Sequence, residues 1–153
     1  MERPILKFET DASGDWVARL SCGHGQHLRH KPPFIVRDWV TTPQGRDGMR
    51  GTCLDCVRCD RFELPDSFVA YKRTPEFDEA TIPPGLRRDH STRVGIWARI
   101  VVLDGRLRYC VEALHRDFEL TRESNGIVVP EVLHHVEAIG PVRFYVEFYR
   151  RET

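Results

Sequence analysis

Two short stretches rich in cysteine and histidine constrain the first half of the chain more than any other feature. Residues 21–30, SCGHGQHLRH, hold one cysteine and three histidines, although the whole chain of 153 residues has 7 histidines. Residues 53–59, CLDCVRC, hold three of the 5 cysteines. Zinc sites commonly draw two ligands from each of two short segments that are distant in sequence. We therefore predict that the first half of the chain folds around a zinc ion.

The predicted zinc ligands are Cys22, His24, Cys56 and Cys59. His27 is an alternative to His24, because a turn after Gly25 would bring either imidazole to the ion. His30 is a third choice, and the sequence does not select among the three. In every version the site is structural, since it uses four protein ligands and leaves no position for a substrate.

A structural ion also explains how a short segment poor in aliphatic residues can fold. The composition changes near residues 60–66, DRFELPD, and Val, Ile and Phe become frequent only after this point. A domain of about sixty residues is marginal by size and commonly needs a metal or disulfides. We predict a zinc-knuckle domain at residues 1–63 and a separate β-domain at residues 64–153.

The pattern of apolar residues predicts strands in both halves. Residues 6–20, LKFETDASGDWVARL, are typical of a hairpin with its turn at residues 11–14. Residues 95–105 and 106–114 are two strand candidates around a turn at Asp104–Gly105, and apolar residues alternate along residues 142–149. No convincing amphipathic helix is present. The chain is therefore expected to be mainly β, with a sandwich or barrel in its second half.

The charge balance and the N-terminal sequence limit the classes of binding partner and the cellular compartment that we expect. Lys plus Arg and Asp plus Glu both number 23, so no net field attracts a nucleic-acid backbone, and we do not expect a nucleic-acid partner. No apolar run approaches the length of a membrane span, and the N-terminus carries no targeting pattern. An odd number of cysteines with C-x-x-C spacing favours a reducing compartment, so we expect a cytoplasmic protein.

Residues 5–60 resemble a known family. The segments GDWVARLSCGHGQHLRHKPPF, RDWVTT and CVRC are similar to those of small bacterial, zinc-ribbon-like proteins of unknown function. This resemblance agrees with a zinc domain but implies no biochemical activity.

Residues 64–150 carry a second resemblance. YKRTPEFDEATIPPGL, HST and PEVLHHV are similar to the tellurite-resistance-type cupin family, which occurs alone or ahead of a methyltransferase domain. The resemblance implies a single-domain cupin, an antiparallel β-barrel or jelly roll, with a link to oxyanion stress. The chain has no G-x-G-x-G nucleotide loop, so methyl transfer is not expected of it.

The cupin resemblance also implies a second metal site. His90 and His134 would be the ligands, with Glu131 as a third, and the ion would be iron, zinc or manganese. The usual glutamate of the first cupin motif is missing. Arg73 and Trp97 are the expected ligand-binding residues, although Arg73 is otherwise a solvated edge-strand charge and Trp97 a core residue.

These expectations combine into one predicted function and one alternative. The first is a stress-associated cupin module that binds a metal and a small molecule or anion, joined to a structural zinc domain. The alternative is a mononuclear iron cupin enzyme, such as an oxygenase acting on a small thiol or oxyanion. The sequence leaves open whether the chain is an enzyme, which ligand it binds, and whether it dimerises through an edge strand of the cupin.

Overall fold

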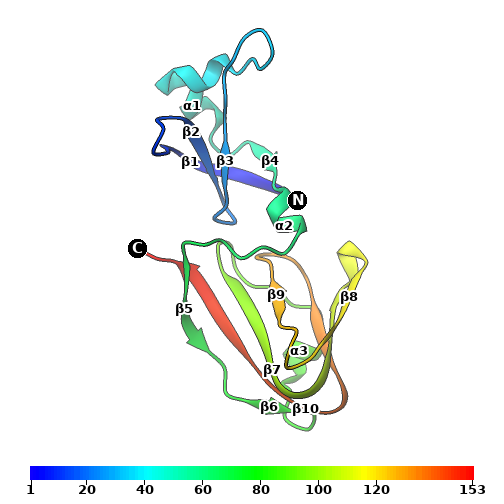
Figure 1. The fold of residues 1–153 in the computed structure, drawn as a ribbon. Coiled ribbons are helices and arrows are strands. Elements are labelled where there is room, and N and C mark those ends of the chain that lie inside the picture. Colours follow the sequence, from blue (N-terminus) through cyan, green and yellow to red (C-terminus); the bar gives the residue numbers. More distant parts are fainter. The chain divides into compact units, whose positions relative to one another are not determined.

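The chain folds into two compact units, each built on its own sheet. The computed structural model describes residues 1–153 and divides them into unit 1, Met1–Glu63, and unit 2, Leu64–Thr153 (Figure 1). Both units are dominated by strands, so the expected mainly β fold is confirmed. None of the helices has the length and apolar character needed to cross a bilayer.

Unit 1 contains a four-stranded antiparallel sheet in the order β3-β2-β1-β4. Its strands are β1 (Glu2–Thr10), β2 (Trp16–Leu20), β3 (Gly25–His27) and β4 (Cys53–Asp55). The predicted hairpin is confirmed, because β1 pairs with β2 across the turn. In that turn the carboxylate of Asp11 accepts hydrogen bonds from the backbone amides of Ser13 and Asp15. Aspartate at the start of a tight turn commonly closes it in this way.

Three short helices connect the strands of unit 1. They are η1 (Asp38–Thr41), α1 (Pro43–Met49) and α2 (Val57–Asp60). Helix α1 begins after Thr42, whose hydroxyl accepts a hydrogen bond from the backbone amide of Gly45, and Pro43 occupies its first position. Both features are standard helix start signals. The aliphatic core of unit 1 is small and consists of Ile5, Val17, Ala18, Leu20, Leu28 and Val40.

Unit 2 is organised by two long antiparallel strands. Its elements are β5 (Phe68–Arg73), β6 (Phe77–Asp78), α3 (Pro84–Arg87), β7 (Trp97–Val111), η2 (Glu112–Leu114), β8 (Arg116–Leu120), β9 (Gly126–Val128) and β10 (His135–Arg151). Strands β7 and β10 pair from His135 opposite Cys110 to Tyr149 opposite Trp97. The sheet order is β5-β10-β7-β8, with β6 paired to β10 and β9 paired to β7 (Figure 1).

The predicted turn at Asp104–Gly105 is wrong, because β7 continues through it as one strand. Gly105 has φ +76° and lies opposite Val142, where residues 139–141 interrupt the register of β10. A Cβ atom at Gly105 would lie 2.1 Å from the carbonyl oxygen of Pro141. Glycine therefore permits a bend in β7 where the two backbones approach closely. Because glycine is also frequent in turns, the sequence at this bend was interpreted as a turn between two strands.

The expected cupin barrel is not supported. A jelly roll divides about eight strands between two sheets. Here β7 and β10 each remain a single long strand, and the strands of unit 2 belong to one six-stranded sheet with β5 and β8 at its ends. The short strands that the turn residues predicted are instead segments of these two long strands.

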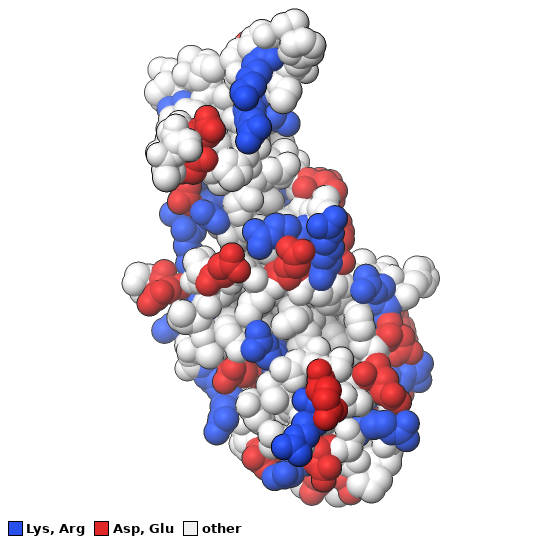
Figure 2. Space-filling model, in the orientation of Figure 1, with Lys and Arg blue, Asp and Glu red and all other residues white.

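Acidic and basic side chains are mixed over the surface. On the face shown in Figure 2, Lys and Arg alternate with Asp and Glu, and no extended area carries one sign. This distribution agrees with equal numbers of acidic and basic residues in the sequence. The face in this view provides no broad basic area for a polyanion.

We expect Gly105→Ala to destabilise unit 2 by more than about 2 kcal/mol, because alanine would occupy a left-handed conformation and meet the carbonyl of Pro141. The matched control is Gly85→Ala in α3, where an added Cβ meets nothing within 4 Å. Urea unfolding followed through methyl NMR signals of unit 2 measures both effects. Equal loss of stability in the two variants would contradict the role assigned to Gly105.

Candidate metal centre and ligand cavity

Strand β1 brings the two cysteine-rich segments of unit 1 together. After β2, the backbone amide of Ser21 donates to the carbonyl of Pro4, and at the start of α2 the amide of Cys56 donates to the carbonyl of Met1. Both segments are therefore fixed to the first residues of the same strand. Between Cys22 and His24, Gly23 adopts φ +98°, which turns the chain so that both side chains reach one point.

The four predicted ligands Cys22, His24, Cys56 and Cys59 form one buried group. Their potential ligand atoms all lie within 4.8 Å of one another, and none of the four residues is more than 4% exposed. His24 Nδ1 lies 3.4 Å from Cys22 Sγ, 3.3 Å from Cys56 Sγ and 3.7 Å from Cys59 Sγ. The sulfurs of Cys22 and Cys56 are 3.8 Å apart, too far for a disulfide. The group can hold a metal ion.

Glu63 orients the histidine of this group. His24 Nε2 lies 2.7 Å from the backbone carbonyl oxygen of Glu63, to which it donates a hydrogen bond. A proton is thereby placed on Nε2, and Nδ1, which faces the sulfurs, is the nitrogen that binds a metal ion once it has lost its own proton. A ligating histidine is commonly held in this way by a carbonyl or carboxylate behind it.

The close packing of the four groups couples their protonation. Hydrogen bonds from Cys22 and then Cys59 lower the pKa of the Cys56 thiol, and hydrogen bonding with Cys22 and Cys56 raises the pKa of Cys59. Burial opposes a charged His24, but its bonds to Cys22 and Cys56 raise its pKa to about 9. Charge is thus concentrated on one thiolate and one imidazole instead of being spread over all four groups.

The two alternative histidines lie outside this group. His27 is exposed on β3, and its Nε2 contacts the carboxylate of Asp11 at 3.0 Å. His30 Nδ1 accepts a hydrogen bond from the backbone amide of Arg37. Of the three histidines in residues 21–30, His24 is the one that the structure brings to the cysteines.

Unit 2 encloses a cavity of about 520 Å³ on the inner face of the β7–β10 pair. Most of its wall is apolar and includes Ala98, Ile100, Val128, Val136, Phe144 and Val146. Tyr71, Lys72 and Thr74 also line it, and residues 90–93 lie along one part of the wall. A largely apolar cavity with a few polar groups is the usual form of a small-molecule site.

Two histidines, His90 and His134, are among the polar groups of the cavity wall. His90 and His134 bond to each other through their backbones, and their ring centroids are 4.2 Å apart. The Nδ1 atom of His90 donates to the carbonyl of Arg88, and that of His134 donates to the carbonyl of Val132. Burial lowers the pKa of His134 to about 4, so this ring is neutral at pH 7. In this tautomer its Nε2 is a hydrogen-bond acceptor.

The other residues expected in a cupin site do not join these histidines. Glu131 is exposed, with φ +65°, and is not part of any cluster of three or more metal-binding side chains. Trp97 is fully buried and does not line the cavity. Arg73 lies over the ring of Tyr145, with its guanidinium carbon 4.8 Å from the ring centroid, and also does not line it. Arg73 is thus an exposed charge on β5, and Trp97 is a core residue, which are the alternatives that the sequence left open for them.

A second cluster, which sequence reasoning missed, lies on the opposite face of the β7–β10 pair. The ligand atoms of Cys110, His135 and Glu137 lie within 4.8 Å of one another. Cys110 is far from His135 and Glu137 in the sequence, and only the strand register brings it opposite His135. No spacing pattern signals such a group.

Comparisons with known proteins describe each half of the chain separately. Residues 6–63 match a family model described as a protein of unknown function, DUF3565, and residues 72–146 match the TehB-like domain. The two expected resemblances are thereby confirmed in their coarse form, and neither match supplies an activity for the first half. The zinc-ribbon identity expected for that half is not established by the match.

The curated relatives of the second half are methyltransferases. Two proteins described as probable S-adenosyl-L-methionine-dependent methyltransferase TehB, from Haemophilus influenzae strains KW20 Rd and 10810, are 26% identical over 90 residues and 27% identical over 82 residues. Each match covers 50% of this chain and 29% of the relative. The chain therefore spans less than a third of the length of these relatives.

Solved structures give the same relationship. The crystal structure of TehB from H. influenzae matches with a TM-score of 0.52 and 27% identity, covering 56% of this chain and 32% of that protein. A protein from E. coli strain K12 matches with a TM-score of 0.55 and 22% identity, covering 60% of this chain and 98% of that protein. The match to the E. coli protein shows a shared fold, and this fold makes up nearly the whole of that protein.

These relatives overturn the predicted function. The stress-associated, tellurite-resistance-like cupin module and the alternative iron cupin oxygenase are both wrong, because the relatives of unit 2 are TehB-like methyltransferases. A cupin metal at His90 and His134 is likewise unsupported. The error arose because two histidines on strand-like segments were interpreted as ligands, whereas neither His90 nor His134 belongs to a group of three or more metal-binding side chains.

We expect Cys56→Ser to remove one metal ion per chain and to unfold residues 5–60, because the small core of unit 1 depends on the buried ligand group. The control is Cys53→Ser, since Cys53 is exposed and lies outside the group. Metal analysis by mass spectrometry and hydrogen exchange of unit 1 peptides provide the readouts. Retention of full metal content and protection in Cys56→Ser would refute the assignment.

We expect the stability of unit 2 to fall as the pH drops from about 6.5 to about 4, because unfolding releases His134 from burial and lets it bind a proton. The pKa is lower in the folded state, so this contribution is complete above pH 6.5 and is lost on acidification; it amounts to at most about 3 kcal/mol. Urea unfolding of unit 2 across this range measures it. His134→Gln should remove the contribution of His134 and so change the dependence, while His115→Asn, at an exposed position, should leave the dependence as in the wild type.

Proposed function

We propose that the chain is a two-part binding protein. In this proposal unit 1 is a structural zinc domain held by Cys22, His24, Cys56 and Cys59. Unit 2 binds an uncharged small molecule with an apolar body and a hydrogen-bond donor. The observation that carries the proposal for unit 2 is the cavity of about 520 Å³ with an apolar wall and a neutral His134 in it.

The donor set and its spacing support zinc in unit 1. A tetrahedral ion with Zn–S bonds of about 2.3 Å and Zn–N bonds of about 2.0 Å places two sulfurs about 3.8 Å apart and a sulfur about 3.5 Å from a nitrogen. The distance from Cys22 Sγ to Cys56 Sγ is 3.8 Å, and the distances from His24 Nδ1 to the sulfurs run from 3.3 to 3.7 Å. Three thiolates and one imidazole with no open position are a structural zinc set.

The groups lining the cavity disfavour a cationic ligand and leave most of the wall to a neutral apolar body. No aspartate or glutamate lines the cavity, whereas Lys72 and Arg93 do, so a cationic ligand has no partner there. His134 Nε2 is an acceptor, and His90 lies against it, so a hydroxyl, thiol or amine hydrogen on the ligand would be paired. The apolar wall would then bury the remainder of the molecule, which is the main source of affinity in such sites.

The TehB relatives support a connection with methyl transfer, and we propose that unit 2 holds the acceptor molecule and not the methyl donor. S-adenosylmethionine carries a positive sulfonium, which the cavity does not complement. Cofactors with an adenosine group are commonly bound at the carboxyl ends of parallel strands beside a glycine-rich loop. Unit 2 is an antiparallel sheet without this arrangement. We place the donor site in the part of the TehB relatives that these matches do not cover.

A fluorescent ligand pair tests the proposal. N-phenyl-naphthylamine is apolar and carries one N–H donor, whereas its N-methyl derivative lacks the donor. We expect the first to bind unit 2 at one per chain and the second to bind at least about tenfold more weakly, a difference of about 1.4 kcal/mol. Fluorescence titration of the full chain measures both affinities.

Two variants locate the binding. Ile100→Phe places a larger ring in the cavity wall and should weaken binding of the amine at least about tenfold. Val101→Phe makes the same kind of change on the opposite face of β7 and should leave binding unchanged. Equal affinities in the two variants would overturn the proposal. Calorimetric binding of S-adenosylmethionine that Ile100→Phe abolishes would also overturn it, by making the cavity a donor site.

A further inference from the structure

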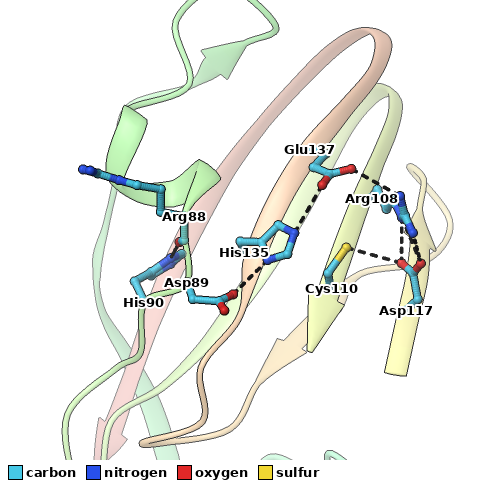
Figure 3. A network of polar contacts seen from close by, with 8 residues as sticks. All are labelled: Arg88, Asp89, His90, Arg108, Cys110, Asp117, His135 and Glu137. Atoms are coloured by element: carbon cyan, nitrogen blue, oxygen red, sulfur yellow. Dashed lines mark hydrogen bonds and ion pairs between the residues drawn. The ribbon is translucent and has the colours of Figure 1, made fainter. Parts of the chain in front are cut away.

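Strand register gathers a set of polar side chains on the outer face of unit 2. His135 on β10, Cys110 on β7 and Asp117 on β8 form one row across three strands, because His135 lies opposite Cys110 and Cys110 lies opposite Asp117. Glu137 follows His135 by two residues and therefore points from the same face. Figure 3 shows these side chains directed toward one another.

We propose that Cys110, His135 and Glu137 form a second binding site for a divalent metal ion of the zinc type. Their ligand atoms already lie within 4.8 Å of one another. A thiolate, an imidazole and a carboxylate are together a borderline-soft set that suits zinc and excludes magnesium or calcium. The site is separate from His90 and His134, which face the cavity on the other side of the strand pair.

The surroundings of His135 are those of a metal ligand. Its Nδ1 lies 2.9 Å from a carboxylate oxygen of Asp89, a residue 46 positions earlier in the chain (Figure 3). This contact fixes the ring, and Nε2 donates to Glu137 at 3.2 Å, so a bound ion would take the place of that proton. A carboxylate behind the distal nitrogen is the common arrangement for a histidine that binds zinc, since it orients the ring and strengthens its lone pair.

The charges of the cluster also favour a cation. Asp89, Asp117 and Glu137 contribute three carboxylates, whereas Arg108 is the cation that the cluster contains (Figure 3). Arg108 Nε donates to Asp117 at 2.9 Å, and Nη1 donates to Glu137 at 3.3 Å. A bound ion would release Glu137 from Arg108, while Asp117 would retain the guanidinium.

The geometry requires only small movements of side chains. Tetrahedral zinc places neighbouring ligand atoms about 3.3 to 3.6 Å apart, so the separations of up to 4.8 Å must close by about 1 Å. Glu137 is exposed and can rotate, whereas Cys110 and His135 are fixed by the sheet. Three protein ligands leave a fourth position for water, so this site exchanges its ion and differs from the closed site of unit 1.

Metal stoichiometry tests the proposal in the full chain. We expect the wild-type chain to bind two zinc ions, one in unit 1 and one at this cluster, in a titration against a chromophoric chelator. Cys110→Ser and Glu137→Gln should each lose one ion or weaken it at least about tenfold, and Asp89→Asn should weaken it about tenfold to a hundredfold. Cys56→Ser should lose the other ion and keep this one.

Two controls separate metal binding from a structural role. Cys53→Ser alters an exposed cysteine outside both groups, and Glu119→Gln alters a carboxylate of the same sheet that pairs with Arg106. Both should bind two ions. Replacement of zinc by cobalt should give a sulfur-to-cobalt charge-transfer band that Cys110→Ser reduces and Cys53→Ser does not. Binding of one ion by wild type and Cys110→Ser alike would overturn the proposal, even if the variant loses stability.

Discussion

The pairing of β7 with β10 is the constraint on which the whole of unit 2 depends. Fifteen residues of β7 and seventeen of β10 run antiparallel, and on either side of the register irregularities successive side chains face opposite sides. The inner side supplies the wall of the cavity, and the outer side supplies the row of Cys110 and His135. Adjacent residues His134 and His135 therefore have unrelated surroundings: one is buried against His90, and the other contacts carboxylates. A shift of one residue in register would exchange these two faces and destroy both.

Unit 1 is too small to form a large apolar core. Its buried aliphatic side chains are few, and three cysteines and one histidine occupy the remaining interior. Without an ion, this interior would hold several polar groups whose protonation states oppose one another. A metal removes the conflict, because it binds the deprotonated sulfurs and the imidazole lone pair together. In this proposal the metal-bound ligand group stabilises unit 1, as a larger apolar core stabilises unit 2.

The sequence predicted local features well and long-range ones poorly, for a physical reason. Cys22 and His24, like Cys56 and Cys59, are close in sequence, so their spacing alone indicated a site before the fold was known. The hairpin of β1 and β2 was likewise visible from its turn residues. Cys110 and His135 meet only because of strand register, which depends on the bend at Gly105 and on the irregularity at residues 139–141. That bend resembles a turn in the sequence, so the long strands were divided and a barrel was expected in their place.

The same limitation explains the error in function. Histidines near strand ends resemble metal ligands in sequence, and what decides is which other ligand-type side chains lie beside each ring. His90 and His134 belong to no group of three or more metal-binding side chains, and burial keeps His134 neutral, so its Nε2 presents an acceptor to a mostly apolar cavity. His135, one residue further, has a carboxylate on each nitrogen and a thiol opposite it across the sheet. We therefore propose metal binding for the outer face of the sheet, where the sequence had suggested it for the interior, and binding of an organic molecule for the inner face.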